Sequence, residues 1–406
     1  MRALLLLLLL IPPSVSTVAK RSAINPETHP NLLWPISEPI FYTFSTNFTS
    51  EESKSDVSRA FQYLEENTCL SFEDSSNWSI NKHNDPILVI TNSTSGCNSW
   101  LGRQVTLKEM AINLTRSCLS KRSISHEILH ALGLDHTQKR HDRDDYVLYF
   151  EENIDSAWRS QYEKWSENDS SNFDVPYDFD SVMHYPSLAF NETDMHLAAK
   201  DELYQIAMGS NDYGPSHSDL LLVNRLYKCL DRCASTKTFC ENGGFVNPRH
   251  CQKRICPRGF MGAFCEEPDV SCGSLVNATD EWQFLKGEST GESACHWHIK
   301  ASEGQQVELV LLNIRQSDYF NSCLMWKSWM EFLVGGYKFV CDSHLPMSIL
   351  KSDGNHAVVT LQSQEEKEYF KLMFRSVKSD QSVQSAVGSV QVAFMLVVFV
   401  INSYLC

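Results

Sequence analysis

The stretch that decides the fold runs from residue 126 to residue 136 and reads His126-Glu127-Ile128-Leu129-His130-Ala131-Leu132-Gly133-Leu134-Asp135-His136. Residues four apart share one face of a helix, so His126 and His130 can direct ring nitrogens to one point. Gly133 can adopt a positive φ and end the helix in a left-handed turn, which lets His136 return as a third ligand. Three imidazoles suit Zn²⁺ and leave one coordination position open. The pattern therefore predicts a catalytic zinc site.

Two further features extend this site. Glu127 follows the first histidine and is the candidate general base for an attacking water. The downstream run Ser181-Val182-Met183-His184-Tyr185 is typical of the Met-turn that accompanies the extended histidine motif. Histidines hydrogen-bonded in a helix core are the alternative interpretation of H-E-x-x-H alone, but the added Gly133, His136 and Met-turn argue against it.

The residues that carry these motifs resemble the astacin family of metzincin zinc endopeptidases. The resemblance rests on residues 126–147 and 181–186 and covers residues 22–229. It implies an α+β, two-lobed catalytic domain with zinc in the cleft between the lobes. It also implies that Met183 forms an apolar floor under the metal. Tyr185 would be an additional zinc ligand that also stabilises the tetrahedral intermediate, a role that a phenol can fill.

Cysteines support this resemblance. It implies a long-range Cys69–Cys229 bridge from the first helix to the end of the domain, and a Cys97–Cys118 bridge ahead of the zinc helix. Spacing alone cannot assign such pairings. Helical spacing is present over 61–69 and 125–134, and a short apolar strand is expected over 87–90.

The chain departs from the family at two places. Thr137 stands where the family carries a glutamate that holds the mature N-terminal ammonium, and threonine cannot supply that negative charge. Lys20-Arg21 is a candidate processing site that would leave Ser22 first, directly after the signal peptide. We therefore expect no prosegment and no latency through an aspartate bound to the zinc.

Two smaller units follow the catalytic domain. Residues 230–266 resemble an EGF-like module, with implied Cys233–Cys251 and Cys256–Cys265 bridges. Arg254 occupies the place of its fourth cysteine, so Cys240 is expected to lack that partner. A weakened bridge and an intermolecular pairing through Cys240 or Cys406 are the two alternatives. Residues 272–376 resemble a CUB domain, a β-sandwich with implied Cys272–Cys295 and Cys323–Cys341 bridges. Alternating apolar stretches at 307–312 and 357–361 independently predict antiparallel strands. Such modules would provide protein contacts.

Composition indicates an extracellular protein. The 406 residues suggest two or three folded units. Lys and Arg number 35 and Asp and Glu 50, so the formal charge is 35 − 50 = −15, which disfavours nucleic-acid binding. The 14 cysteines favour an oxidising compartment. Seven N-x-S/T sequons are candidate glycosylation sites: Asn47, Asn77, Asn92, Asn113, Asn168, Asn191 and Asn277.

The chain ends give the remaining targeting signals. Residues 1–19 have the positive start, short apolar run and small exit residues of a secretory signal peptide, because the run is too short to span a membrane. Residues 377–406 combine a polar linker with the apolar stretch 392–401. This tail is interpreted either as a lipid-anchor addition signal or as a soluble, poorly ordered terminus.

The sequence therefore predicts a secreted zinc-dependent endopeptidase that hydrolyses extracellular proteins, with His126, His130, His136 and Tyr185 on the metal. The alternative is a weak or inactive extracellular binding protein built on a protease scaffold. Attachment to a membrane through the C-terminal tail stays open.

Overall fold

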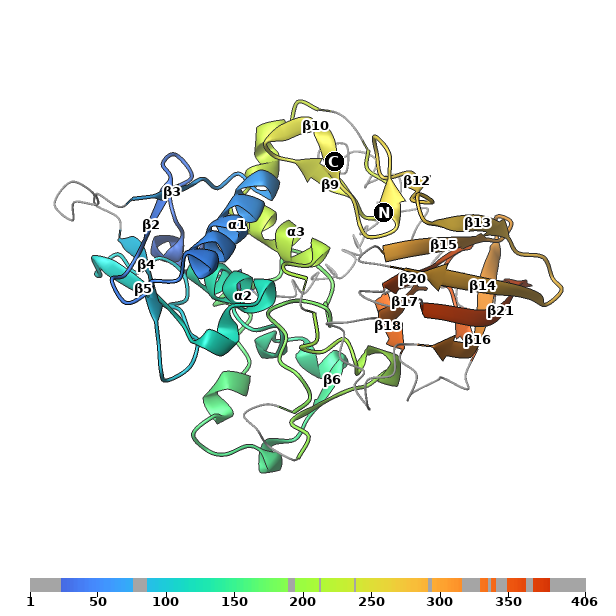
Figure 1. Cartoon of the computed structure of the whole chain (residues 1–406), viewed down its shortest axis with the longest axis horizontal. Helices are drawn as coiled ribbons and strands as arrows, with labels where there is room; N and C mark the ends of the chain where they lie inside the picture. The colour runs from blue at the N-terminus through green and yellow to red at the C-terminus, as the bar shows by residue number, and fades with distance from the viewer. Residues whose placement is uncertain are drawn as a thin grey trace, which may run out of the picture.

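The computed structural model describes residues 23–75, 86–188, 194–211, 213–236, 239–290, 294–315, 329–334, 337–340, 349–362 and 368–379. The predicted signal peptide, the C-terminal tail, Asn77, Asn191, and the Cys323–Cys341 pair lie outside these residues. Within the described part of the chain, no helix is long and apolar enough to cross a membrane. Figure 1 shows a mixed domain at the N-terminal end, a small module beside it and a β-sandwich beyond.

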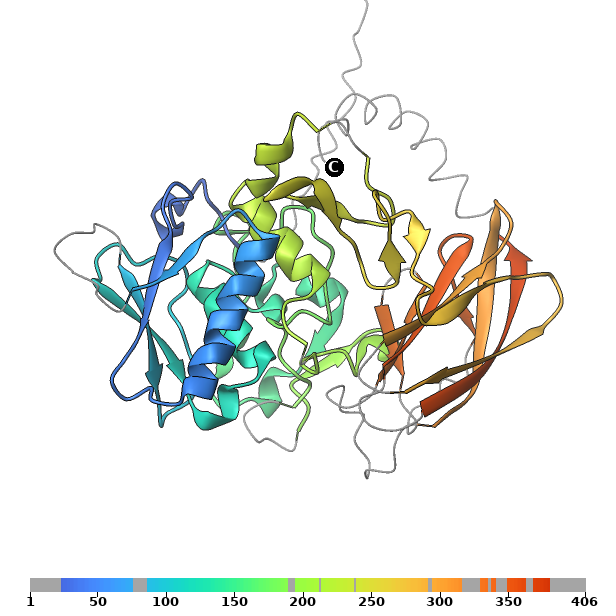
Figure 2. The ribbon, with the colours of Figure 1, turned by 45° about the horizontal axis from the view of Figure 1, so that its top comes forward.

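The first lobe is a parallel sheet with two helices against it. Its strand order is β3-β2-β4-β5, all neighbours parallel. Figures 1 and 2 show α1 and α2 on the same side of this sheet. The bounds are β2 Ile40–Phe44, α1 Glu51–Asn67, β3 Phe72–Asp74, β4 Ile87–Asn92, β5 Glu109–Leu114 and α2 Lys121–Ala131.

Helix α1 begins ten residues before the predicted start at residue 61. Ser50 caps it by accepting a hydrogen bond from the Ser53 backbone N–H, and acidic residues fill its first turn. Its first turns are largely polar, so apolar spacing does not mark them. Its buried face includes Val57, Phe61 and Leu64, which pack into the main core.

The second lobe has little regular structure, and short pairs of strands and single helical turns hold it together. β1 (Ala23–Ile24) pairs with β7 (Ser170–Ser171), and β6 (Val147–Tyr149) pairs with β8 (Leu197–Ala199). Helix α3 (His217–Leu226) completes the domain with a capping box from Ser216 to Asp219. The 3-10 turns are Pro30–Leu32, Arg116–Cys118, Thr137–Lys139, Arg143–Asp145, Glu151–Asn153, Arg159–Tyr162, Glu202–Tyr204 and Cys229–Cys233.

The structure contains both disulfides expected in this domain. Cys69–Cys229 spans 160 residues and joins the end of α1 to the turn after α3. Cys97–Cys118 spans 21 residues ahead of α2.

Removing the longer bridge should cost more stability than removing the shorter one. In the chain-entropy model, Cys69→Ser with Cys229→Ser should lower the free energy of unfolding by about 5 kcal/mol, against about 3 kcal/mol for Cys97→Ser with Cys118→Ser. Urea unfolding followed by tryptophan fluorescence measures both. An equal or larger loss for the shorter bridge would contradict the prediction.

The small module (residues 230–268) is built from two short hairpins and disulfides. β9 (Phe245–Asn247) pairs with β10 (His250–Ile255), and β11 (Phe260–Met261) pairs with β12 (Glu267–Pro268). Cys233–Cys251 and Cys256–Cys265 are both formed. Cys240 is disulfide-bonded too, so the missing fourth cysteine does not leave it as a free thiol. Its partner is none of those four cysteines, in keeping with Arg254 at the place of the fourth cysteine.

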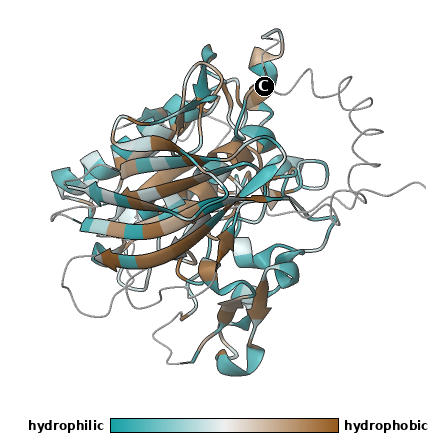
Figure 3. Cartoon of the chain, turned by 90° about the vertical axis from the view of Figure 1, so that its right-hand side faces the viewer, coloured by the Kyte–Doolittle hydropathy of each residue, from teal (hydrophilic) through white to brown (hydrophobic). Residues whose placement is uncertain are grey.

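The C-terminal sandwich (residues 272–379) packs a five-stranded sheet, β13-β15-β20-β17-β18, on a four-stranded sheet, β14-β21-β16-β19. Figure 3 faces this unit and shows hydrophobic residues alternating with hydrophilic ones along its strands. The Cys272–Cys295 bridge joins its first two cysteines. The bounds are β13 Gly273–Asn277, β14 Gln283–Ser289, β15 Ala294–Lys300, β16 Gln305–Arg315, β17 Trp329–Leu333, β18 Tyr337–Val340, β19 Leu350–Lys351, β20 His356–Gln362 and β21 Glu368–Lys378.

Candidate metal centre

The three predicted histidines meet at one point. His126 and His130 lie one turn apart on α2, which ends at Ala131 rather than at residue 134. Gly133 then adopts φ +97°, a conformation that strains other residues, and a Cβ at this position would lie 2.7 Å from Ile24 Cδ1, so the Ile24 side chain would have to shift. The reversal places Nε2 of His136 3.1 Å from Nε2 of His130 and 3.2 Å from Nε2 of His126.

The distances fit a tetrahedral zinc ion. Zn–N bonds of about 2.0–2.1 Å at tetrahedral angles separate the ligand nitrogens by roughly 3.3 Å. The Nε2 atoms of this cluster are close to that spacing, and His126, His130 and His136 form the metal-binding group found among the described residues. His130 and His136 are 9% and 7% exposed, whereas His126 is only partly buried.

Backbone carbonyls set the orientation of two imidazole rings. The Val182 carbonyl accepts a hydrogen bond from Nδ1 of His126 at 2.8 Å, and the Leu134 carbonyl accepts one from Nδ1 of His130 at 2.7 Å. A carbonyl only accepts, so Nδ1 carries the proton and Nε2 presents its lone pair to the centre. His136 has Oδ1 of Asp135 3.5 Å from its Nδ1.

The histidines are suited to remain uncharged. Burial lowers the pKa of all three imidazoles, and the mutual repulsion of protonated rings lowers those of His126 and His136 further. A neutral imidazole is the form that binds a metal, so the site needs no proton release from these residues at neutral pH.

Glu127 follows His126 on α2 and is buried. The side chain is 5% exposed, and burial raises the pKa of its carboxyl to about 8. Its Oε2 has no hydrogen-bond partner within the described part of the chain. A buried acceptor without a partner is costly unless something else fills the role, and a water held near the histidines would do so.

Tyr185 and Met183 lie on the segment that faces α2. The ring centroid of Tyr185 is 4.3 Å from that of His136, and burial raises the pKa of the Tyr185 phenol, which keeps it protonated. Met183 is 1% exposed in the main core, and its carbonyl accepts a hydrogen bond from the Thr137 backbone N–H at 3.0 Å.

The Met-turn (residues 181–185) depends on a carboxylate that motif analysis missed. Oδ1 of Asp219 accepts from the Ser181 hydroxyl at 2.6 Å, and Oδ2 accepts from the Val182 backbone N–H at 3.1 Å. Asp219 is buried on α3, and burial raises its pKa to about 7. The capping-box pattern Ser216-x-x-Asp219 could have marked it as a helix start, but not as a support for the Met-turn.

Comparison with known proteins identifies the family. The model for the peptidase family Astacin matches residues 27–228. Zinc metalloproteinase nas-27 of Caenorhabditis elegans is 30% identical over 371 residues, which are 84% of this chain and 84% of that protein. The chain belongs to the astacin family of zinc metalloproteinases.

Two further proteins are similar to this chain. Zinc metalloproteinase nas-28 of C. elegans is 31% identical over 339 residues, 79% of this chain, and the chain spans 65% of that relative's length. The solved structure of high choriolytic enzyme 1, a hatching-enzyme zinc protease of the medaka Oryzias latipes, is 27% identical, with a TM-score of 0.43 over 51% of this chain and 98% of that one.

The departure at Thr137 does not leave the start of the domain exposed. Ala23 and Ile24 are 1% and 2% exposed, and the Ile24 backbone N–H donates to the Gly133 carbonyl at 3.1 Å. Threonine at position 137 is therefore compatible with burial of Ala23 and Ile24. Ser22 lies outside the described residues.

The described sequons lie mainly on the surface. Asn47, Asn92, Asn168 and Asn277 are exposed, and Asn113 on β5 is partly buried. Glycosylation at these asparagines stays a prediction.

Proposed function

We propose that this protein is a secreted zinc-dependent endopeptidase that hydrolyses extracellular proteins. One observation carries the proposal: three histidine nitrogens converge beside a buried glutamate whose Oε2 has no described hydrogen-bond partner. His126, His130 and His136 would hold one zinc ion, with Tyr185 as an additional ligand. Family membership supports zinc as the metal.

The residues suggest how peptide hydrolysis proceeds. Zinc, when bound, supplies Lewis-acid polarisation of the scissile carbonyl and of the attacking water. Glu127 accepts the proton of that water and passes it to the leaving amine, which restores the carboxylate. Tyr185, protonated because it is buried, donates a hydrogen bond to the oxyanion.

The remaining units extend this proposal. We interpret residues 230–266 as an EGF-like module and residues 272–376 as a CUB domain, placed after a catalytic domain at residues 22–229. Two hairpins with disulfides and a two-sheet sandwich support these assignments. The disulfides and the predicted signal peptide support secretion.

A protease assay tests the function. Purified protein should cleave casein or a fluorogenic peptide, and o-phenanthroline should stop cleavage until zinc is restored. Activity that is insensitive to the chelator would exclude the zinc mechanism. No cleavage at full zinc occupancy would instead favour the binding protein on a protease scaffold.

Replacing Tyr185 with phenylalanine should lower kcat by about 10²-fold, with KM little changed, because the hydroxyl acts on the oxyanion rather than on the bound substrate. Steady-state kinetics on the fluorogenic peptide measure both constants. Tyr204→Phe is the matched control, since Tyr204 stacks on Phe179 in the second lobe. Equal kcat values for Tyr185→Phe and the wild type would contradict the assigned role.

A further inference from the structure

We propose that Arg258 of the small module is a positioning residue for the metal centre, because it ties the segment next to the Met-turn to the C-terminal sandwich. The inference rests on the proposed function, since it assumes that the three histidines hold a metal. According to this proposal, the small module and the sandwich help to position the residues around the metal, in addition to any contacts they make with other proteins.

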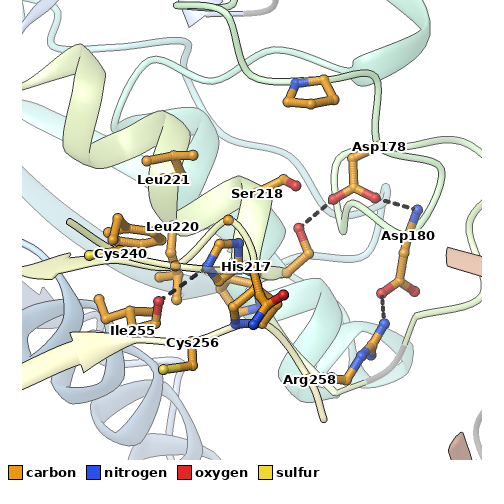
Figure 4. A pocket seen from close by; sticks show the side chains of 18 of the residues that line it. Asp178, Asp180, His217, Ser218, Leu220, Leu221, Cys240, Ile255, Cys256 and Arg258 are labelled. Atoms are coloured by element: carbon orange, nitrogen blue, oxygen red, sulfur yellow. Dashed lines mark hydrogen bonds and ion pairs between the residues drawn. The ribbon is translucent and has the colours of Figure 1, made fainter. Parts of the chain in front are cut away.

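Arg258 connects three structural units. Its Nη2 lies 2.6 Å from Oδ2 of Asp180 in the catalytic domain and 3.0 Å from Oε2 of Glu331 on β17 of the sandwich. Figure 4 shows the pair with Asp180. Asp180 is 3% exposed and Glu331 1% exposed. The guanidinium lies within ion-pair distance of both nearly buried carboxylates, so its removal would leave both without their cation.

Asp180 is linked to the histidines through the Met-turn. It immediately precedes Ser181 and Val182, whose hydroxyl and backbone N–H donate to Asp219. The carbonyl of Val182 then accepts the hydrogen bond from Nδ1 of His126. A shift of Asp180 therefore moves the carbonyl that orients a metal ligand, and partners of ligands in this position tune metal affinity and activity.

Asp180 borders a cavity on the side of the small module. A cavity of about 760 Å³ opens between α3 and this module, and Asp178, Asp180 and Arg258 line it together with Phe239 and Leu333. Figure 4 shows the acidic residues and Arg258 at one end of this cavity. Towards the small module, the Asp180 side chain makes the ion pair with Arg258. Within the catalytic domain, the Asp180 carbonyl accepts a hydrogen bond from Nδ2 of Asn211 at 2.7 Å, and its backbone N–H donates to Oδ1 of Asp178 at 2.9 Å.

The small module does not need Arg258 to stay attached. At its other end, Arg249 donates to the Glu65 and Leu70 carbonyls at the end of α1, and the Asn247 side chain donates to the Glu66 carbonyl at 2.9 Å. None of these contacts involves a residue of the Met-turn. Arg249 thus provides a matched arginine that anchors the same module without touching the metal centre.

The test compares Arg258→Met, Arg258→Lys and Arg249→Met in the full chain. Arg258→Met should bind zinc about 10-fold more weakly and show a kcat about 10-fold lower, with KM for a short peptide unchanged. Arg258→Lys should restore part of both losses, because an ammonium can still pair with the carboxylates. Zinc affinity comes from competition with a chromophoric chelator, which does not depend on activity.

If Arg258→Met fails to fold, Glu331→Gln tests the same ion-pair cluster from the side of the sandwich. It changes only the sandwich, yet it should weaken zinc binding and lower kcat in the same direction as Arg258→Met. Arg249→Met should leave both quantities at the wild-type level.

Wild-type zinc affinity and kcat in folded Arg258→Met or Glu331→Gln would overturn the proposal, as would an equal loss in Arg249→Met. Failure of the wild-type protein to cleave any substrate would refute the proposed function alone. The differences in zinc affinity between the variants would still test the role of Arg258.

Discussion

Replacing Glu127 with glutamine is expected to reduce kcat by about 10²–10⁴-fold while one zinc ion per chain remains bound. The amide has nearly the same shape as the carboxyl but cannot accept a proton from water. Glu127 is not one of the three converging ligands, so the histidine nitrogens stay in place. Steady-state kinetics give the loss of kcat, and elemental analysis gives the zinc content.

The control for this variant is Glu109→Gln. Glu109 is an exposed glutamate at the start of β5 in the same domain, so its replacement should leave both activity and zinc content unchanged. If Glu127→Gln kept wild-type turnover with full zinc occupancy, Glu127 would not be the general base. The site would then need another proton acceptor.

Replacing His136 with alanine is expected to remove both the metal and the activity. The turn at Gly133 brings His136 back to the cluster. Its Nε2 lies 3.1 Å from Nε2 of His130 and 3.2 Å from Nε2 of His126. Two remaining imidazoles cannot form the three-nitrogen set that a catalytic zinc requires. Zinc affinity should fall by at least about 100-fold, and cleavage should become undetectable at stoichiometric zinc.

Competition with a chelator measures the affinity of the His136→Ala variant. His250→Ala is the matched control, because His250 is an exposed histidine on β10 of the small module. Retention of one tightly bound zinc ion in His136→Ala would exclude His136 as a ligand. Circular dichroism must show that both variants are folded, because α2 and its following turn belong to the main core.

The spacing of apolar residues in the sequence predicted part of the secondary structure. Apolar spacing correctly located the helix that carries the histidines and the strands β4, β16 and β20. It placed the start of α1 too late, because the first turns of that helix are stabilised by capping and charge. The second lobe could not be predicted from periodicity, since its 3-10 turns and two- and three-residue strands are too short to carry a period.

The sequence by itself determined which residues could hold the metal. Helical periodicity puts His126 and His130 on one face, and Gly133 permits the turn that returns His136; both effects act within eleven consecutive residues. Only the tertiary structure decided what orients and supports them: the Val182 carbonyl on His126, Asp219 under the Met-turn, and Arg258 between Asp180 and Glu331. These partners lie tens of residues apart in the chain, and packing brings them together. A helical or strand period records only which face of an element is buried, not which distant group will lie against it.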